Sequence, residues 1–252
     1  MLLLFDIDGT LLLKASTEHK EALHEAICAV HHIEIPTGRI EAPGRTDPAI
    51  ARSILTLAGV DAKRVDDRME ELRAASCEAY ARRCPADLSA TVSPGMPEIL
   101  RHLALAGHIL SLVTGNFEAI ARLKLRRAGI GEHFAAGQGG FGSDHEDRAA
   151  LPAVARRRAG RRCAPPEGPC SRAETIVIGD TPRDIACAHA DGVRCIAITT
   201  GPFEREELVG ADAVVDTPRE LAAAVAALAA EAAGLTAHGL QPPRSLWALG
   251  RP

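Results

Sequence analysis

The sequence predicts a doubly wound parallel α/β sheet with a helical domain inserted after its first strand. Over most of the chain, short and nearly continuous apolar runs alternate with segments of helical periodicity. Such runs are typical of parallel strands whose two faces are both covered by helices. Directly after the first apolar run, by contrast, about 80 residues show helical periodicity alone. These two observations indicate one sheet domain and one smaller helical insert.

The predicted strands are short segments rich in Leu, Ile and Val. They cover residues 2–5, 108–113, 175–178, 194–198 and 213–215. Helical patterns cover residues 117–128, 148–159, 183–190 and 218–233. Strands that alternate with helices are joined by right-handed crossovers, so we expect these segments to form a single Rossmann-like parallel sheet.

The helical insert has three predicted helices, over residues 17–31, from residue 46 onward and over residues 62–83. The second begins at Thr46-Asp47-Pro48, where an N-cap residue precedes a proline in the first helical turn. The first and second helices each place apolar side chains along one face, as a helix that packs on its neighbours requires. The insert is therefore predicted to be an all-helical domain.

These segments divide the chain into three parts. Residues 1–14 and 89–233 form the predicted sheet core, and residues 15–88 form the helical insert. The end of the chain, residues 234–252, lacks periodicity and is predicted to be a tail. Residues 160–172, which are rich in proline, glycine and arginine, are predicted to be a long exposed loop.

The composition excludes several classes of protein. The chain has 252 residues, of which 46% are hydrophobic and 25% charged, as in ordinary globular proteins. Its net charge of −4 gives no reason to expect nucleic acid or an anionic membrane as a partner. The seven cysteines show no C-x-x-C spacing, which favours reduced thiols over a disulfide framework or a zinc site.

The location of the protein is predicted from its apolar runs. The apolar N-terminal run is interrupted by Asp6 and Asp8 after five residues, and no basic region precedes it, unlike a signal peptide. Nowhere else is an apolar run long enough to span a bilayer. We therefore expect a cytoplasmic protein.

Polar and acidic residues follow three of the predicted strands. The three segments are Asp6-Ile7-Asp8-Gly9-Thr10, Thr114-Gly115-Asn116 and Gly179-Asp180-Thr181-Pro182-Arg183-Asp184. Ligands of open α/β sheets bind at the carboxyl ends of the strands, where these segments meet. Neighbouring carboxylates repel one another unless a cation neutralises them, and a site rich in hard oxygen ligands suits Mg²⁺. We therefore predict Mg²⁺ as the cofactor.

Taken together and in this order, these motifs resemble the haloacid dehalogenase superfamily. The helical insert after the first motif resembles the cap of its phosphoglycolate phosphatase-like group. The resemblance covers the chain up to about residue 233. It implies a Mg²⁺-dependent phosphatase that hydrolyses small phosphomonoesters through an aspartyl-phosphate intermediate on Asp6, beneath a cap of about 70 residues.

The resemblance also implies roles for the carboxylates. Asp6 is the nucleophile and a metal ligand, since a carboxylate that attacks phosphorus divides one hard displacement into two. Asp8 protonates the leaving oxygen, then deprotonates the attacking water, and its backbone carbonyl reaches the metal. Asp180 is the main metal anchor. Asp184 is either a further metal ligand or a residue that only caps the helix after Arg183.

Four further residues are expected to contact the phosphate group. Thr114 supplies a hydroxyl, or is an ordinary helix cap. Gly9 lets the chain turn sharply past the site. Gly115 and Asn116 precede a helix whose N-terminal amides favour phosphate.

A fixed cation for the phosphate oxygens is the one part that departs from the family pattern. The family places a lysine, often followed by proline, between the second and fourth strands, and Lys124 is the only lysine in that interval. It falls about eight residues into the predicted helix, roughly 12 Å from the N-terminus of that helix at 1.5 Å per residue. Arg148 begins the next helix, and arginine can hold phosphate bidentately. We therefore predict Arg148 as the cation and only a small effect of replacing Lys124.

In the insert, the turn Gly44-Arg45-Thr46-Asp47 resembles the cap loop that faces the active site in capped members of the family. Arg45 would there bind a second anionic group of the substrate. The same residues also read simply as the start of a helix, and the sequence does not separate the two interpretations.

Two other functions remain open. A phosphosugar mutase of the same family would use Asp6 and Asp8 but return the phosphoryl group to the sugar. A catalytically idle binding protein could use the same fold, since a fold alone does not specify function. The expected partner is a small phosphorylated metabolite, and the protein is expected to be a monomer or a homodimer.

Overall fold

The computed structural model describes residues 1–38, 40–160, 169–232 and 234. Its centre is a six-stranded parallel sheet in the order β3-β2-β1-β4-β5-β6. The strands are β1 (Leu2–Phe5), β2 (Ile109–Thr114), β3 (Gly140–Phe141), β4 (Thr175–Gly179), β5 (Arg194–Ile198) and β6 (Ala213–Val215). Because β1 lies between β2 and β4, the segments that follow these three strands emerge side by side at one edge of the sheet.

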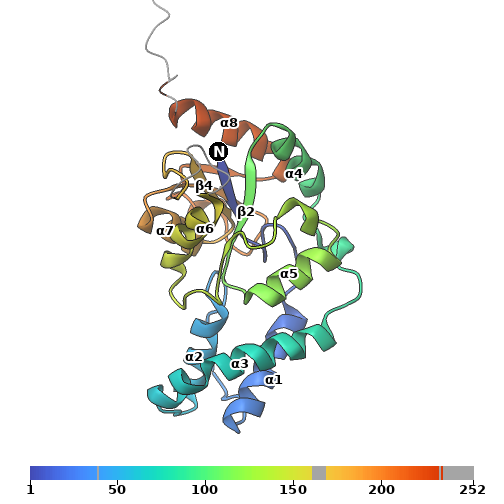
Figure 1. Ribbon diagram of the computed structural model, residues 1–252, viewed down its shortest axis with the longest axis vertical. Coiled ribbons are helices and arrows are strands. Elements are labelled where there is room, and N and C mark those ends of the chain that lie inside the picture. The colour runs from blue at the N-terminus through green and yellow to red at the C-terminus, as the bar shows by residue number, and fades with distance from the viewer. Residues whose placement is uncertain (39, 161–168, 233, 235–252) are drawn as a thin grey trace, which may run out of the picture.

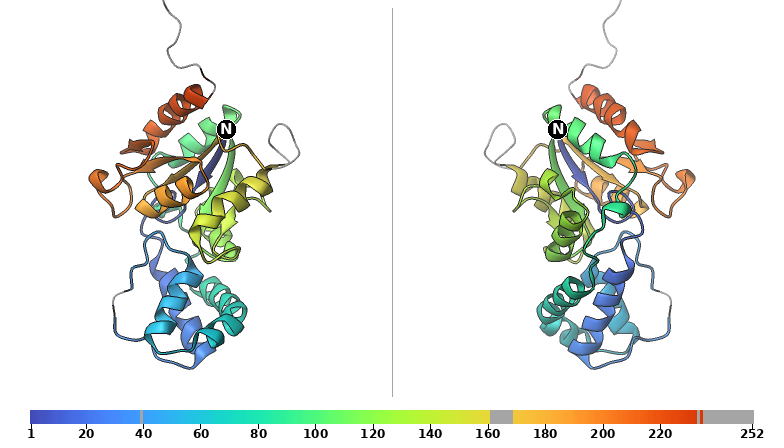
Figure 2. Two further views of the ribbon diagram at one scale, coloured as in Figure 1. Left: turned by 90° about the vertical axis from the view of Figure 1, so that its left-hand side faces the viewer. Right: turned by 90° about the vertical axis from the view of Figure 1, so that its right-hand side faces the viewer.

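Helices cover both faces of this sheet (Figures 1 and 2). Alternate side chains of β1 point to opposite faces, as the pleat requires. Leu3 and Phe5 join the apolar core formed with α4 (Met96–Leu105), α5 (Glu118–Arg127) and α8 (Pro218–Ala232). Leu2 and Leu4 join the second core, formed with α6 (Leu151–Ala159) and α7 (Pro182–Ala190). The doubly wound fold predicted from the sequence is confirmed.

The helices inserted after β1 form a separate layer below the sheet in Figure 1. They are α1 (Thr17–His31), α2 (Asp47–Leu57) and α3 (Ala62–Arg83). The predicted bounds of the first and third helices agree with the structure. Thr46 caps α2 as predicted, since its hydroxyl accepts a hydrogen bond from the Ala49 amide. We call this layer the cap.

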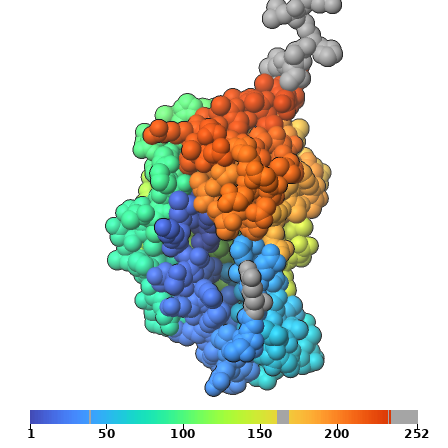
Figure 3. All heavy atoms as spheres, turned by 180° about the vertical axis from the view of Figure 1, so that it is seen from behind, coloured from blue at the N-terminus to red at the C-terminus, as the bar shows by residue number. Residues whose placement is uncertain are grey.

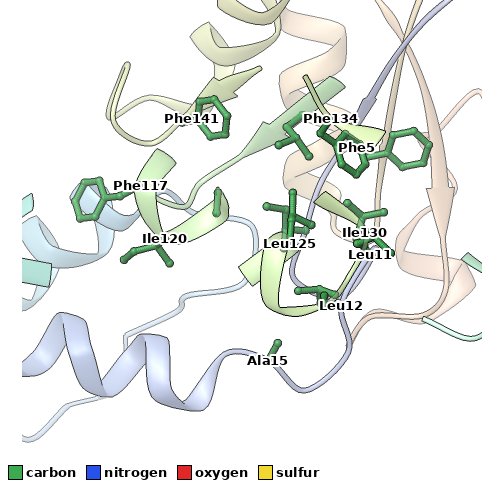
Figure 4. Packing of buried hydrophobic residues seen from close by; sticks show 14 of the residues in the cluster. Phe5, Leu11, Leu12, Ala15, Phe117, Ile120, Leu125, Ile130, Phe134 and Phe141 are labelled. Atoms are coloured by element: carbon green, nitrogen blue, oxygen red, sulfur yellow. The ribbon is translucent and has the colours of Figure 1, made fainter. Parts of the chain in front are cut away.

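The apolar core that contains Leu3 and Phe5 extends toward the cap through the loop after β1. Leu11 and Leu12 lie beside Leu125 of α5 in Figure 4. The Phe5 and Phe134 rings meet edge to face with centroids 6.1 Å apart. This packing places the start of the cap, and the loop that precedes it, against the middle of α5.

Polar contacts also hold the cap against the core. The Asp47 amide donates to the Gly115 carbonyl at 2.8 Å, and the Thr46 hydroxyl donates to the Glu146 carbonyl at 2.6 Å. Arg52 of α2 forms an ion pair with Glu146 at 2.7 Å. The structure therefore shows the cap closed over the sheet edge.

Several elements differ from the sequence predictions. Strand β3 and helix α4 were not predicted: β3 has only two residues, and α4 lies between the predicted insert and the predicted strand at residues 108–113, where no element was assigned. Five cysteines are free thiols, but Cys170 is disulfide-bonded, so the expectation of reduced thiols does not hold for it. Most of the predicted 160–172 loop and of the 234–252 tail lies outside the described residues.

No helix in the described part of the chain is both long and apolar enough to cross a membrane.

Candidate active site

The residues that follow β1, β2 and β4 converge at the carboxyl edge of the sheet. Phe5 at the end of β1 pairs with Leu112 of β2 and with Ile178 of β4. Asp6 therefore emerges between Thr114, the last residue of β2, and Asp180, the first residue after β4. The structure thus brings together the three strand ends that the sequence singled out.

Three of these carboxylates form one buried cluster. One oxygen from each of Asp6, Asp180 and Asp184 lies within 4.8 Å of the others, and all three residues are buried. Burial, together with the charges of Asp184 and Asp8, raises the pKa of Asp6 to about 6 despite the neighbouring Arg148. Burial and the charges of Asp184 and Asp6 raise the pKa of Asp180 to about 8. A cation bound here would relieve this repulsion.

The surroundings of Asp180 fit a metal ion. Its Oδ1 accepts a hydrogen bond from Thr10 at 2.7 Å, whereas its buried Oδ2 has no hydrogen-bond partner. A Cβ at Gly9 or at Gly201 would collide with this carboxylate, so both glycines keep the space beside it open. Gly9 also has φ +94°, which other residues rarely adopt. A hard oxygen donor left unpaired in such a space is what Mg²⁺ or a similar cation requires.

Asp184 is engaged on both oxygens. Its Oδ2 accepts hydrogen bonds from the Thr181 amide at 3.0 Å and hydroxyl at 2.8 Å, and its Oδ1 accepts from Arg148. It thereby closes the capping box at the start of α7. Asp184 is near enough to Asp6 and Asp180 to share in a metal site. Its observed contacts, however, are the cap of α7 and the ion pair with Arg148.

Arg148 lies on the other side of Asp6. Its Nη2 is 3.1 Å from the Asp6 carboxylate and also donates to Asp184. The side chain is buried, and its Nε has no hydrogen-bond partner. Arg148 is therefore a fixed cation beside the predicted nucleophile, and its buried Nε–H makes no hydrogen bond within the described part of the protein.

Lys124 is the residue that sequence reasoning placed wrongly. Its ammonium lies 2.7 Å from both oxygens of Asp8 and 3.1 Å from His19 Nδ1, and its side chain is fully buried. An ammonium has three N–H donors, and these three acceptors use them all. The expectation that Lys124 lies too far from the site is therefore wrong.

The error came from measuring distance to the N-terminus of the helix. The loop after β1 packs against the middle of α5, so Asp8 meets the helix near Lys124 rather than at its start. The sequence did carry a signal. Lys124 falls on the same helical face as Ile120, Ala121 and Leu125, so it is a single lysine on an otherwise apolar face. A buried lysine requires a partner.

Asp8 is held as a carboxylate by its neighbours. Burial acts to raise the pKa of Asp8, but the charge and hydrogen bonds of the Lys124 ammonium outweigh it and lower that pKa below its ordinary value. Asn116 Nδ2 donates a further hydrogen bond to Asp8 at 2.9 Å. Asp8 is not part of the three-carboxylate cluster, and its side chain contacts Lys124 and Asn116 instead.

A buried chain of hydrogen bonds connects Asp8 with the cap. Lys124 can only donate, so His19 Nδ1 accepts and His19 Nε2–H donates to Asp47 Oδ2, 3.1 Å away. The same Asp47 oxygen accepts from the Phe117 amide at 2.7 Å. His19 and Asp47 belong to the cap, whereas Lys124 and Phe117 belong to the core. Cap closure thus completes the surroundings of Lys124.

After β2, some of the backbone groups predicted to bind phosphate already form hydrogen bonds to other protein groups. The amides of Phe117 and Glu118, at the start of α5, donate to Asp47 and to the Ser143 hydroxyl at 2.8 Å. Gly115 is covered by the backbone of Arg45, which leaves no room for a side chain there. Thr114 is buried and lines the same cavity as Asp6. Protein groups thus already satisfy two of the amides expected to bind phosphate.

Arg45, the predicted anion-binding residue of the cap, lies just before α2 and folds back onto that helix. Its guanidinium donates to the Ala49 carbonyl at 2.9 Å, to the Ser53 hydroxyl at 2.8 Å and to the Glu41 carbonyl at 3.4 Å.

A cavity of about 640 Å³ joins these groups between cap and core. Its floor contains the predicted nucleophile Asp6 with Asp8, Arg148 and Asp180. Three buried polar atoms of its lining have no hydrogen-bond partner: Asp180 Oδ2, Arg148 Nε and Asn116 Oδ1. These atoms are one donor and two acceptors, so the site contains hydrogen-bonding capacity that the described part of the protein does not use.

Comparison with known proteins agrees with this arrangement. A family model described as haloacid dehalogenase-like hydrolase matches residues 3–189, and a second HAD-hydrolase-like model matches residues 150–236. The phosphoglycolate phosphatase of Pseudomonas putida is 28% identical over 95% of this chain and 84% of its own length. That of Synechococcus elongatus is 28% identical over 54% of this chain, and the match spans only 59% of the cyanobacterial protein.

Solved structures show the same fold. The HAD hydrolase, family IA, variant 3, of Entamoeba histolytica superposes with a TM-score of 0.63 at 17% identity, over 90% of this chain and 98% of that one. The first family model covers well over half of the chain and includes all three strand ends of the site. The chain therefore belongs to the haloacid dehalogenase-like hydrolases.

Proposed function

We propose that the protein is a Mg²⁺-dependent phosphatase that hydrolyses small phosphomonoesters through an aspartyl-phosphate on Asp6. The observation that carries this proposal is the position of Asp6, on a cavity floor between a three-carboxylate cluster and the buried cation Arg148. Phosphoryl transfer depends mainly on positioning and on neutralising charge, and this floor offers both. The two curated relatives bear the name phosphoglycolate phosphatase, which supports the same class of reaction.

The carboxylate cluster is the proposed metal site. Asp6 and Asp180 would hold the cation together with the backbone carbonyl of Asp8, and Asp184 would support them through Thr181 and Arg148. When bound, the cation neutralises charge on the phosphate oxygens and lets Asp6 stay ionised near a phosphate dianion.

The chemical steps fall to the protein side chains. Asp6 attacks the phosphorus atom, and the bond to the leaving oxygen breaks as that oxygen takes a proton from Asp8. Water then attacks the aspartyl-phosphate, Asp8 accepts the proton of the water, and phosphate leaves with Asp6 restored. Arg148 orients the phosphoryl group through its free Nε–H. The lowered pKa of Asp8 makes its role as a base the easier of the two.

Phosphate release tests the proposal. Small phosphomonoesters are incubated with the protein in Mg²⁺ and then in EDTA, and inorganic phosphate is measured. We expect release in Mg²⁺ that EDTA stops and added Mg²⁺ restores. A folded protein that releases no phosphate but converts one sugar phosphate isomer into another would instead be a phosphosugar mutase. A protein that does neither would be a binding protein.

Metal binding is expected to stabilise the protein more at high pH than at low pH. The folded-state pKa values of Asp6 and Asp180 lie above their unfolded values, so the metal-free folded state binds more protons than the unfolded state between about pH 4 and 8. Stability without metal therefore falls as pH rises through this window. Mg²⁺ competes with those protons and should restore the lost stability at pH 8.

Thermal unfolding with and without saturating MgCl₂ measures this effect. At pH 8 we expect a rise in Tm of about 5 °C or more, and at pH 5.5 a much smaller one. The Asp180→Asn variant should lose most of the response at pH 8. Equal shifts at both pH values would place the Mg²⁺ site somewhere other than at these carboxylates.

A further inference from the structure

The roof of the cavity differs chemically from its floor. The floor carries the carboxylates and Arg148, whereas the cap contributes Leu23 of α1, Ile50 and Ile54 of α2, and Ile35 and Ile40 from the segment between these helices. Leu23 and Ile54 are buried, and the other three are partly buried. Figure 3 shows the face where the blue N-terminal part of the chain, the light-blue cap segment and the orange C-terminal part of the core meet.

Three polar residues of this roof, Arg45, His19 and Asp47, already have partners. The Arg45 guanidinium donates hydrogen bonds to Ala49, Ser53 and Glu41. His19 and Asp47 are joined to one another and to the core. The other polar residues that the cap region adds to the described lining are at its rim: Lys14, Ser16 and Lys20 are exposed and His24 is partly exposed, so all four have access to water.

A leaving group bound under this roof would lose water without gaining polar partners from these residues. Each hydroxyl or carboxylate that is desolvated without a partner weakens binding, whereas each buried methylene strengthens it. The volume of about 640 Å³ also lies well within the range of pockets that enclose drug-sized ligands, so it exceeds the need of a bare phosphate.

From these observations we infer that the substrate is a phosphomonoester with a bulky apolar leaving group, of the alkyl or aryl class. This inference rests on the proposed function, because the phosphate group is placed on the floor beside Asp6 and Arg148. The apolar group then extends to the cap, where Leu23, Ile50 and Ile54 surround it. Short polar esters, such as phosphoglycolate and the sugar phosphates, lack that group.

Binding of n-alkylphosphonates tests the inference without turnover, because their C–P bond replaces the ester bond. Calorimetric titration in Mg²⁺ would compare the methyl to hexyl members, which share one headgroup. We expect Kd to fall by about fourfold for each added methylene. Phosphonoacetate, which carries a carboxylate on the same headgroup, should bind at least tenfold more weakly than propylphosphonate. A Kd that is independent of chain length, or tighter binding of phosphonoacetate, would overturn the inference, as would no binding of any member.

Two matched variants locate the effect. Ile50→Thr makes one partly buried position of the roof polar, and it should reduce the gain per methylene for the longer chains. Ile99→Thr makes the same change at a partly buried position of α4 that does not line the cavity, and it should leave the gain unchanged. If both variants reduced the gain in affinity per methylene equally, the apolar roof would not be the source of that gain.

The matching esters separate this inference from the proposed function. Propyl phosphate and glycerol 3-phosphate share a three-carbon chain and differ by two hydroxyls. Faster hydrolysis of propyl phosphate supports both proposals. If glycerol 3-phosphate is hydrolysed faster, the phosphatase stands and the apolar leaving group is wrong. If phosphonates bind with the expected dependence on chain length but neither ester is hydrolysed, the ligand class stands and the phosphatase function is wrong.

Discussion

The Asp6→Asn variant is expected to lose at least about 10⁴-fold in kcat, the scale of loss seen when a catalytic nucleophile is removed. The amide cannot form the aspartyl-phosphate. Its shape is nearly that of the carboxylate, so the packing around β1 stays intact. One negative charge also leaves a cluster in which Asp180 and Asp184 repel Asp6, so the metal-free variant should be at least as stable as the parent.

Two measurements check this prediction. Steady-state phosphate release gives kcat, and thermal unfolding in EDTA gives the stability of the metal-free protein. The parent protein quenched during turnover should carry acid-stable phosphate at Asp6, detectable by mass spectrometry, whereas the variant should carry none. Turnover within tenfold of the parent would show that Asp6 is not the nucleophile.

The Lys124→Met variant is expected to lose both stability and activity. Methionine fills a similar volume but leaves Asp8 without the ammonium that touches both its oxygens. Breaking a fully buried ion pair costs about 3–5 kcal/mol, and the loss here should be about 2–3 kcal/mol, because 27% of the Asp8 side chain stays exposed. We expect kcat/KM to fall by about 10²-fold, since Asp8 would be neither oriented nor charged as in the parent.

The pH profile separates positioning from a loss of folding. Asp8 is the proposed base in the hydrolysis of the aspartyl-phosphate, a step that kcat reports. Lys124 lowers the pKa of Asp8, so its removal should raise that pKa and move the acidic limb of kcat to higher pH. Lys63→Met is the matched control, because the exposed Lys63–Asp67 pair on α3 should contribute less than about 1 kcal/mol. Adding Asp8→Asn to Lys124→Met should restore most of the stability and none of the activity. An unshifted limb would limit Lys124 to a structural role.

Much of the fold follows from local patterns in the chain. The apolar runs, the helical periodicities and the Thr46-Asp47-Pro48 start of α2 are short-range signals, and they predicted five of the six strands and the three cap helices. Strand β3 escaped because two residues carry no periodicity. Helix α4 was also missed, because no element was assigned between the predicted insert and the predicted strand at residues 108–113.

The site residues likewise divide into those that the sequence could place and those that it could not. Asp6, Asp180 and Thr114 could be placed at one edge from the sequence, because parallel strands end together and each of these residues follows or ends a strand. Arg148 was chosen as the only well-placed cation at a helix start, and the structure brings it to Asp6. The catalytic roles of these residues remain predictions for the experiments above.

What the sequence by itself determined is the order of the elements and the chemistry at the strand ends, because both depend on neighbours within a few residues. Tertiary structure alone decided the pairing of Asp8 with Lys124 and the apolar roof of the cavity. Each of these depends on how the cap and α5 pack against the loop after β1. Such packing joins residues more than a hundred positions apart, and no spacing along the chain records which side chains then meet.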